Sequence, residues 1–373
     1  MSKNQNILFI SGHDFRSPRK ANVHFIAQAA TEQFKRVSFF SIGFSSLSRY
    51  KGDPRISLAG KANRWENVGG VDCYLWKTPV HPFNLGGRRL SGPVGLLYRA
   101  YAALPCAELD ERCADADVIV LESGLAPIFI PRLRRLAPSA KFAYIASDLL
   151  STIGVHPVVS KALTAGLHEF GVIRVPARAM LPAFSAAGEK AVYIPQGIDK
   201  SIAAKPMSNP YGPGRHIVSV GSMLFDPTFF EIAAKAFPDI SFHLIGAKGP
   251  YKLPANVSQY PEMPFEKTLP YIKFADAGVA PYKAHPDADY LSDSSLKLVQ
   301  YGYLGLPAIC PYFAAGDYPG RFGYTPGDSV SITSAIDKAL LAKGNFTPSP
   351  ALSWTEVAGV MFSRLSAESS PSA

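Results

Sequence analysis

The sequence predicts an α/β protein with two doubly wound parallel sheets, and three observations support this fold class. The chain has 373 residues, which suits two domains of roughly 150 to 200 residues each. Apolar runs of strand length alternate with helix-like stretches in both halves. Hydrophobic residues make up 47% of the chain and charged residues 18%, so there is enough apolar material for two buried cores.

A break in this pattern marks the expected domain boundary. Residues 199–214 lose the periodicity and accumulate Pro, Gly, Ser and Asn, as interdomain linkers do. We therefore expect an N-terminal Rossmann-like domain over residues 1–200 and a C-terminal Rossmann-like domain over residues 201–350. The remaining segment, residues 351–373, contains a helix-like stretch that we expect to cross back to the first domain.

The apolar runs of the first half are bounded by turn residues and are short enough for buried strands. They cover residues 6–12, 36–43, 71–76, 117–123 and 141–148, with 171–176 and 191–197 as extensions. The stretches between them place apolar side chains near helical spacing, over residues 21–34, 95–113 and 127–137. Strands that alternate with helices in this way predict parallel βαβ units.

The second half repeats the alternation. Strands are predicted over residues 215–223, 241–249, 257–263, 276–282 and 307–313. Helices are predicted over residues 226–237, 265–274, 292–303 and 329–342. Because open α/β sheets bind ligands at the carboxyl ends of their strands, we expect the two domains to face a shared central cleft.

The net charge of +9 is unevenly distributed. Residues 1–105 hold 15 Lys and Arg against 5 Asp and Glu, whereas residues 106–373 hold 23 against 24. Such an excess suits a polyanionic partner, either nucleic acid or an anionic membrane surface. Charge alone leaves both partners open.

Basic residues interleaved with aromatic and aliphatic ones, over residues 77–99 and 132–135, favour a surface that dips into lipid headgroups. The alternative is a helix with a solvated basic face. No run approaches the ~20 apolar residues of a membrane span, and the N-terminus lacks a signal-peptide layout, so we expect a cytoplasmic protein. The residues predicted to contact the membrane or acceptor are Arg88, Arg89, Arg99, Arg132, Arg134 and Arg135.

The sequence lacks the motifs that bind several classes of cofactor. The first strand is followed by neither GxGxxG nor a Walker sequence, which disfavours a dinucleotide cofactor and a P-loop NTPase. The four cysteines form no CxxC pair and the histidines no metal-binding pattern. Two DxD triplets, starting at Asp115 and Asp287, could hold a divalent cation, but we discount both, because the first is a turn before a buried strand and the second lies in a polar loop. We expect no metal and no cofactor.

A phosphate site is predicted at the start of the helix over residues 292–303. Ser294 and Ser295 stand where exposed backbone N–H groups can bind a diphosphate, with Ser292 or Asp293 as the expected N-cap. Lys297 in the first turn can reach a phosphate or a sugar carboxylate. The alternative is an ordinary capping cluster with a solvated lysine.

Two further loops are expected to line the same phosphate site. Gly221 would let the backbone approach a ligand closely, and Met223 offers a polarizable face for a uracil ring. Tyr282 follows the next strand, where its hydroxyl could bond ribose or phosphate. The alternatives are a core methionine and a half-buried aromatic side chain.

In the first half, Asp148 ends a predicted strand and is the candidate general base. A carboxylate there could take the proton from an attacking hydroxyl, which contributes ~100 to 10,000-fold in rate. The alternative makes Asp148 the N-cap of a helix that begins directly after it.

Four stretches resemble the GumK family, the membrane-associated glucuronosyltransferases of xanthan assembly. They are ASDLLSTI, VGSMLFDPTFF, YLSDSSLKLVQYGYLGLPAICP and RFGYTPGDS, over residues 146–153, 220–230, 290–311 and 321–329. The resemblance implies a GT-B fold and metal-independent, inverting transfer of glucuronate from its uridine diphosphate sugar to a polyprenyl-diphosphate-linked oligosaccharide. It places this reaction in exopolysaccharide biosynthesis, at the cytoplasmic face of the inner membrane.

The resemblance also implies roles for individual residues. Asp148 matches the catalytic base of the family, Met223 a uracil contact and Tyr282 a donor-binding residue. The diphosphate- and sugar-binding helix of the family matches Ser294, Ser295, Lys297 and Gln300. We choose Lys297 as the partner of the glucuronate carboxylate.

Two other readings stay open on the residues alone. A nucleotide-sugar epimerase can share this fold, but it uses no second substrate and needs no membrane patch. A nonenzymatic nucleic-acid-binding protein would use the basic first domain, although no nucleic-acid motif is present and we expect no such partner.

Overall fold

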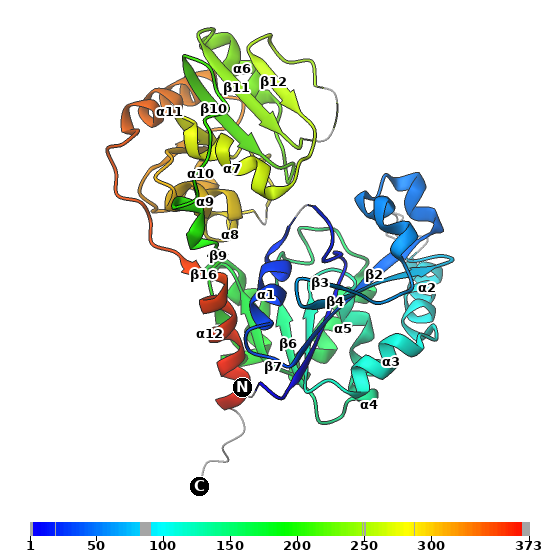
Figure 1. Ribbon diagram of the computed structural model, residues 1–373. Coiled ribbons are helices and arrows are strands. Elements are labelled where there is room, and N and C mark those ends of the chain that lie inside the picture. The colour runs from blue at the N-terminus through cyan, green and yellow to red at the C-terminus, as the bar shows by residue number, and fades with distance from the viewer. Residues whose placement is uncertain are drawn as a thin grey trace. The chain divides into compact units, whose positions relative to one another are not determined.

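The computed structural model describes residues 3–18, 20–82, 91–247, 249, 251–286 and 288–367. The chain divides into two compact units, which are described separately (Figure 1). The first unit runs to Ile194 and includes the C-terminal helix from Trp354 onward, and the second spans Pro195–Ser353. The division thus falls between Ile194 and Pro195 rather than at residue 200.

The described part of the first unit contains an eight-stranded sheet in the order β3-β4-β2-β1-β5-β6-β7-β8. All neighbours are parallel except β3 and β4. The strands are β1 (Asn6–Ser11), β2 (Arg36–Ser45), β3 (Glu66–Val68), β4 (Val71–Thr78), β5 (Val118–Glu122), β6 (Lys141–Ile145), β7 (Phe170–Val175) and β8 (Ala191–Tyr193). Because the chain reverses its direction of travel across the sheet between β1 and β5, the ends of these strands form the switch point.

The central strands are apolar except at their ends because helices cover both faces of the sheet. Ile7 and Ile10 of β1 pair with Val118 and Leu121 of β5, and all four side chains are buried. The helices are α1 (Asn22–Ala30), α2 (Ser91–Ala103), α3 (Ala107–Ala114), α4 (Ile130–Leu136), α5 (Pro157–Gly166) and α12 (Trp354–Ala367).

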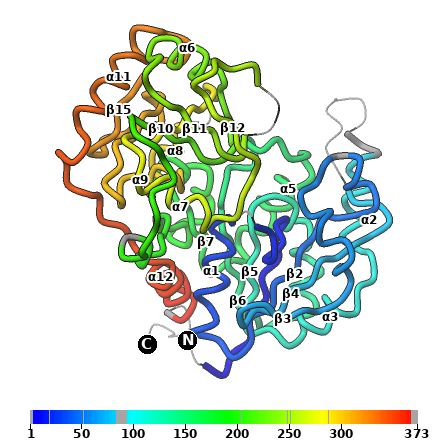
Figure 2. Tube along the Cα trace, turned by 45° about the horizontal axis from the view of Figure 1, so that its top comes forward, coloured from blue at the N-terminus to red at the C-terminus, as the bar shows by residue number. Residues whose placement is uncertain are grey.

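The C-terminal helix α12 is part of the core of the first unit. It lies beside α1 in both views (Figures 1 and 2) and packs against β6 and β7. Trp354 stacks on Phe25 with ring centroids 5.0 Å apart, and Phe362 meets Phe34 edge-on at 5.1 Å. These aromatic pairs bury apolar area that neither helix could bury alone.

Some predicted helices of the first unit differ in the structure. The helix predicted over residues 95–113 is two helices, α2 and α3, because Pro105 between them lacks an amide hydrogen. The helix predicted over residues 127–137 begins as a 3₁₀ turn, η4 (Ala126–Phe129), before α4. Between β2 and β3 the chain forms two 3₁₀ helices, η1 (Ser46–Lys51) and η2 (Pro54–Lys61), that periodicity did not indicate.

The second unit has, among its described residues, a six-stranded parallel sheet in the order β12-β11-β10-β13-β14-β15. Its strands are β10 (Arg215–Val220), β11 (Ile240–Ile245), β12 (Val257–Tyr260), β13 (Ala277–Val279), β14 (Ala308–Pro311) and β15 (Arg321–Tyr324). Its helices are α6 (Thr228–Ala236), α7 (Phe265–Phe274), α8 (Leu291–Ser294), α9 (Leu296–Tyr303), α10 (Tyr312–Ala315) and α11 (Ser329–Ala342). The switch point of this sheet lies between β10 and β13.

The helix predicted over residues 292–303 is interrupted at Ser295. Its ψ of 107° is extended, so a single turn, α8, precedes α9. Ser295 is the N-cap of α9 because its Oγ accepts a hydrogen bond from Leu298 N at 3.3 Å. The prediction of Ser292 or Asp293 as N-cap is therefore wrong, since both residues lie inside α8.

Candidate functional site

The switch point of the second unit gathers several of the predicted donor-binding residues. Gly221 follows β10 directly, and Tyr282 comes three residues after β13. The two loops are joined, because Asp226 N donates to Pro281 O at 2.8 Å and Lys283 N donates to Leu224 O at 2.7 Å. The backbone at this edge of the sheet is therefore held in one arrangement before any ligand binds.

Gly221 has a conformation that glycine adopts without strain. Its φ is +90°, and its amide donates to Ile245 O at 2.8 Å, which fixes the turn. A β-carbon at this position would lie 3.9 Å from Lys297 Nζ. The ammonium group of Lys297 thus stands directly over the turn that follows β10.

Tyr282 links this turn to the start of α9. Its side chain is only 2% exposed, and its hydroxyl lies 2.6 Å from Ser295 Oγ. Lys297 Nζ lies 5.3 Å from the centroid of the Tyr282 ring, within the range of a cation–π interaction. The tyrosine hydroxyl therefore supports the N-cap of α9, and the ring positions the lysine.

The other predicted donor residues belong to the same elements. The carbonyl of buried Ser294 accepts a hydrogen bond from Gln196 Nε2 at 2.9 Å. Gln300 is half-buried on α9, three positions after Lys297 and hence on the same helix face. Met223 is half-buried in the loop between β10 and α6. The structure brings Gly221, Tyr282, Ser295 and Lys297 into direct proximity, with Met223 and Gln300 on the adjoining loop and helix.

The side chains of Arg321 and Tyr318, for which the sequence indicated no role, hold α8 in place. Arg321 Nη1 donates to Ser292 O and to Ala314 O, and its guanidinium lies 4.0 Å from the centroid of the Tyr318 ring. The Tyr318 hydroxyl donates to the Asp293 carboxylate. Burial lowers the pKa of Arg321. These contacts hold the turn that precedes Ser295, so they act on the site through its backbone.

The switch point of the first unit centres on a buried glutamate. Glu122, the last residue of β5, is 1% exposed and accepts a hydrogen bond from the hydroxyl of Ser11, the last residue of β1. Ser147, just after β6, lies 2.8 Å from the other oxygen of Glu122. Three strand ends are thus tied to one carboxylate, although the sequence interpretation had treated Glu122 only as the end of a strand.

Asp148 is half-buried at this same edge. Its amide donates to Ser123 Oγ at 3.2 Å, and Ser147 beside it is bonded to Glu122. The next helix, α5, starts at Pro157 and has His156 as its N-cap, with Val158 N donating to His156 Nδ1 at 3.2 Å. The alternative that made Asp148 a helix cap is therefore wrong.

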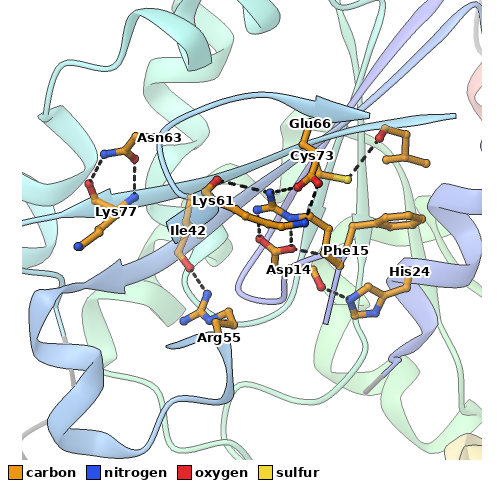
Figure 3. Close-up of polar contacts among 12 residues, drawn as sticks. Asp14, Phe15, His24, Ile42, Arg55, Lys61, Asn63, Glu66, Cys73 and Lys77 are labelled. Atoms are coloured by element: carbon orange, nitrogen blue, oxygen red, sulfur yellow. Dashed lines mark hydrogen bonds and ion pairs between the residues drawn. The ribbon is translucent and has the colours of Figure 1, made fainter. Parts of the chain in front are cut away.

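The described residues between β1 and α1 are anchored at two points. Buried His24 accepts from Ala21 N at 2.8 Å through Nδ1, so its Nε2 donates to Asp14 O at 2.9 Å. Asp14 forms an ion pair with Arg16 at 2.9 Å, and Arg16 also pairs with Glu66. Figure 3 shows Asp14, Glu66 and His24 in this region. Burial, and then the proximity of His13, lowers the pKa of His24 to about 3.

The predicted basic surface is only partly exposed in the structure. Arg132 is bonded to Asp110 and to the Leu104 carbonyl, and Arg134 to Glu169 and to backbone carbonyls. These two guanidinium groups therefore stabilise the first unit through internal hydrogen bonds. Arg99 and Arg135 are exposed. Arg88 and Arg89 lie outside the described residues.

Neither a membrane span nor a metal cluster is found in the described part of the chain. None of the helices there is both long and apolar enough to cross a bilayer. Within the same residues, no three His, Cys, Asp or Glu are grouped so that they could hold a metal ion. Of the DxD residues, Asp117 accepts a hydrogen bond from Asn6 N at 2.7 Å and Asp115 from Asn6 Nδ2 at 3.1 Å, and Asp287 is not described.

Comparison with known proteins identifies the family. Residues 9–176 match the family model of the N-terminal domain of the glucuronosyltransferase GumK. The chain is 44% identical over 339 residues to the UDP-glucuronate:glycolipid 2-beta-glucuronosyltransferase of Xanthomonas campestris pv. campestris, which covers 90% of this chain and 84% of that protein. This chain belongs to the GumK glucuronosyltransferase family. It is accordingly a glycosyltransferase.

Solved structures confirm the GT-B fold of this GumK family member. Anabaena Alr3699/HepE, solved in complex with UDP and glucose, matches with a TM-score of 0.63 at 14% identity, over 97% of this chain and 100% of that one. The UDP-forming α,α-trehalose-phosphate synthase of Burkholderia xenovorans matches with a TM-score of 0.58 at 12% identity, over 97% and 96%. At such identities the likeness establishes the fold alone.

Proposed function

We propose that this GumK family member transfers glucuronate from UDP-glucuronate to a polyprenyl-diphosphate-linked oligosaccharide during exopolysaccharide synthesis. The observation that carries the proposal is the 44% identity, over 90% of the chain, to a protein named for transfer from UDP-glucuronate to a glycolipid. The matched length of 339 residues exceeds either unit alone, so the similarity extends into both units.

The donor is assigned to the second unit. A diphosphate is favoured at the N-terminus of α9, because the helix dipole and the Lys297 ammonium both attract negative charge. Gly221 lets the backbone come close to the ligand, and Met223 in the same loop offers its thioether to the uracil ring. Ser294, Ser295 and Gln300 complete the diphosphate and sugar contacts.

The catalytic base is assigned to Asp148. Its carboxylate takes the proton of the acceptor hydroxyl while that oxygen attacks the anomeric carbon and UDP leaves. UDP-glucuronate carries its diphosphate in the α configuration, and the relative forms a beta linkage, so the proposed reaction inverts the anomeric carbon. The positive end of α9 and Lys297 stabilise the charge that develops on the leaving diphosphate, and no metal is assigned a role.

The acceptor is assigned to the first unit at the cytoplasmic face of the inner membrane. A glycolipid is the acceptor named for the relative, and the first 105 residues hold 15 basic against 5 acidic residues. Exposed Arg99 and Arg135 are available to anionic headgroups, which attract basic residues by about 1 kcal/mol each.

The proposal is tested with the purified full chain in two steps. Calorimetric titration with UDP-glucuronate, UDP-glucose and UDP-galactose is expected to give the tightest binding for UDP-glucuronate. Radiolabelled UDP-glucuronate mixed with lipid-linked oligosaccharide and anionic vesicles is expected to label the lipid fraction. Preference for an uncharged sugar donor, or label that stays in the aqueous fraction, would contradict the proposed donor or acceptor, respectively.

A further inference from the structure

The residue His13 stands out at the switch point of the first unit. It comes two positions after the end of β1, and its side chain is 50% exposed, whereas Ser11 and Glu122 beside it are buried. Its Nε2 lies 3.9 Å from Glu122 Oε1. Ligands of open α/β sheets bind at this edge, so a half-exposed imidazole here faces the region where a ligand is expected.

The backbone and the side chain of His13 depend on the same glutamate. His13 N donates to Ser11 Oγ at 2.8 Å, and the Ser11 hydroxyl in turn donates to Glu122. The remaining oxygen of Glu122 faces both His13 Nε2 and Ser147 Oγ. One buried carboxylate therefore bonds both the serine that holds the His13 amide and the serine that precedes Asp148, and it lies 3.9 Å from the His13 imidazole.

The backbone on both sides of the segment that carries His13 is bonded to buried His24. His24 bonds to Asp14 O and to Ala21 N, which are at opposite ends of the loop, and its ring centroid lies 5.5 Å from that of His13. Because hydrogen bonds already hold the backbone near His13, a bound ligand would have to order mainly the His13 side chain. This arrangement suits recognition rather than simple packing.

We propose that His13 contacts the acceptor sugar, and that Glu122 is the positioning residue that orients the His13 imidazole. This inference rests on the proposed function, in which a glycan hydroxyl is the nucleophile and Asp148 the base. In the tautomer that carries its proton on Nε2, the nitrogen nearer Glu122, Nδ1 is an acceptor for a hydrogen bond from a sugar hydroxyl. The 3.9 Å between Nε2 and Glu122 Oε1 is longer than a hydrogen bond, so the proposal requires these two groups to approach each other when the acceptor binds.

The first test measures acceptor and donor separately in the full chain. The probes are UDP-glucuronate and a lipid-extracted, polyprenyl-diphosphate-linked oligosaccharide. His13→Ala is expected to raise the KM for the oligosaccharide by about 2 to 12-fold, because one hydrogen bond to a sugar hydroxyl is lost, while the Kd for UDP-glucuronate stays within about twofold. An unchanged acceptor KM, or a matching loss of donor affinity, would overturn the proposal.

A matched control is His168→Ala. His168 is also exposed and lies beside a glutamate, with Nε2 3.2 Å from Glu169, but it precedes β7 and so lies at the opposite edge of the same parallel sheet. Its removal is expected to leave the acceptor KM unchanged. A rise equal to that of His13→Ala would show that the effect is not specific to this edge.

The second test asks whether Glu122 acts through His13. Glu122→Gln alone is expected to raise the acceptor KM, whereas in the His13→Ala background it should add nothing further, a coupling that a purely structural role would not produce. Thermal unfolding checks that each variant is folded. Additive effects would overturn the positioning role of Glu122.

The two proposals fail in different ways. If the unmodified chain does not glucuronidate the lipid-linked oligosaccharide, the proposed function itself is contradicted. If the unmodified chain is active and the His13→Ala variant has an unchanged acceptor KM, only the proposed role of His13 is contradicted.

Discussion

Replacement of Lys297 by alanine tests the donor site most directly. The ammonium group lies 5.3 Å from the centroid of the Tyr282 ring and 3.9 Å from where a β-carbon on Gly221 would be, so it stands at the junction of the two switch-point loops. A charge-assisted hydrogen bond contributes about 1.5 to 3 kcal/mol. Since 1.4 kcal/mol is tenfold in affinity, Lys297→Ala should weaken UDP-glucuronate binding by about 10 to 150-fold.

The assay is calorimetric titration with UDP-glucuronate, UDP-glucose and UDP. If Lys297 pairs with the glucuronate carboxylate, the loss for UDP-glucuronate should exceed the losses for UDP-glucose and UDP by about tenfold. Lys338→Ala, which removes an exposed lysine on α11 of the same unit, serves as the matched control and should change none of the three affinities. Equal losses for all three ligands would limit Lys297 to the diphosphate, and no loss for any of them would refute the donor site as described.

Three further predictions concern single residues. Asp148→Asn should fold normally and keep its donor affinity but lose transfer by about 100 to 10,000-fold, and near-full turnover would remove Asp148 as the base. Gly221→Ala places a β-carbon on a residue with φ of +90°, so we expect a loss of about 1 to 2 kcal/mol in the free energy of unfolding, measured by urea titration. Burial lowers the pKa of His24 to about 3 from an unfolded value near 6.5, so the unfolded state binds a proton first on acidification. Stability should therefore decrease as the pH falls from about 6.5 towards 3, and His24→Gln should flatten that dependence in urea titrations at several pH values.

In the proposed function, the chemistry is divided between the two switch points. In the second unit, Lys297 and the start of α9 supply positive charge for a diphosphate. In the first unit, Glu122 and half-buried Asp148 supply carboxylates. Burial, and then the charges of Glu122 and Asp148, raises the pKa of Tyr144, which indicates that both carboxylates act on one region of the first unit. A cation for the leaving group and a carboxylate for the nucleophile are what glycosyl transfer requires.

Local pattern in the sequence determined much of the fold. The apolar runs over residues 6–12, 117–123 and 141–148 predicted β1, β5 and β6, and the helix predicted over residues 329–342 matches α11. These elements were readable because burial on one or both faces imposes a period on neighbouring residues. The same strand predictions also located Gly221, Tyr282 and Asp148 at strand ends, where ligands of such sheets bind.

Tertiary structure alone decided which of those strand ends meet. The partners Ser11 and Glu122 are 111 positions apart, and their contact exists because β1 and β5 are neighbours in the sheet. The choice of Ser295 as the N-cap of α9 likewise depends on the Tyr282 hydroxyl, which reaches it from the end of β13. Periodicity in the sequence reports only whether a residue is buried. The pairing of polar groups between distant segments follows from the order of the strands in the sheet, and the chain acquires that order only when it folds.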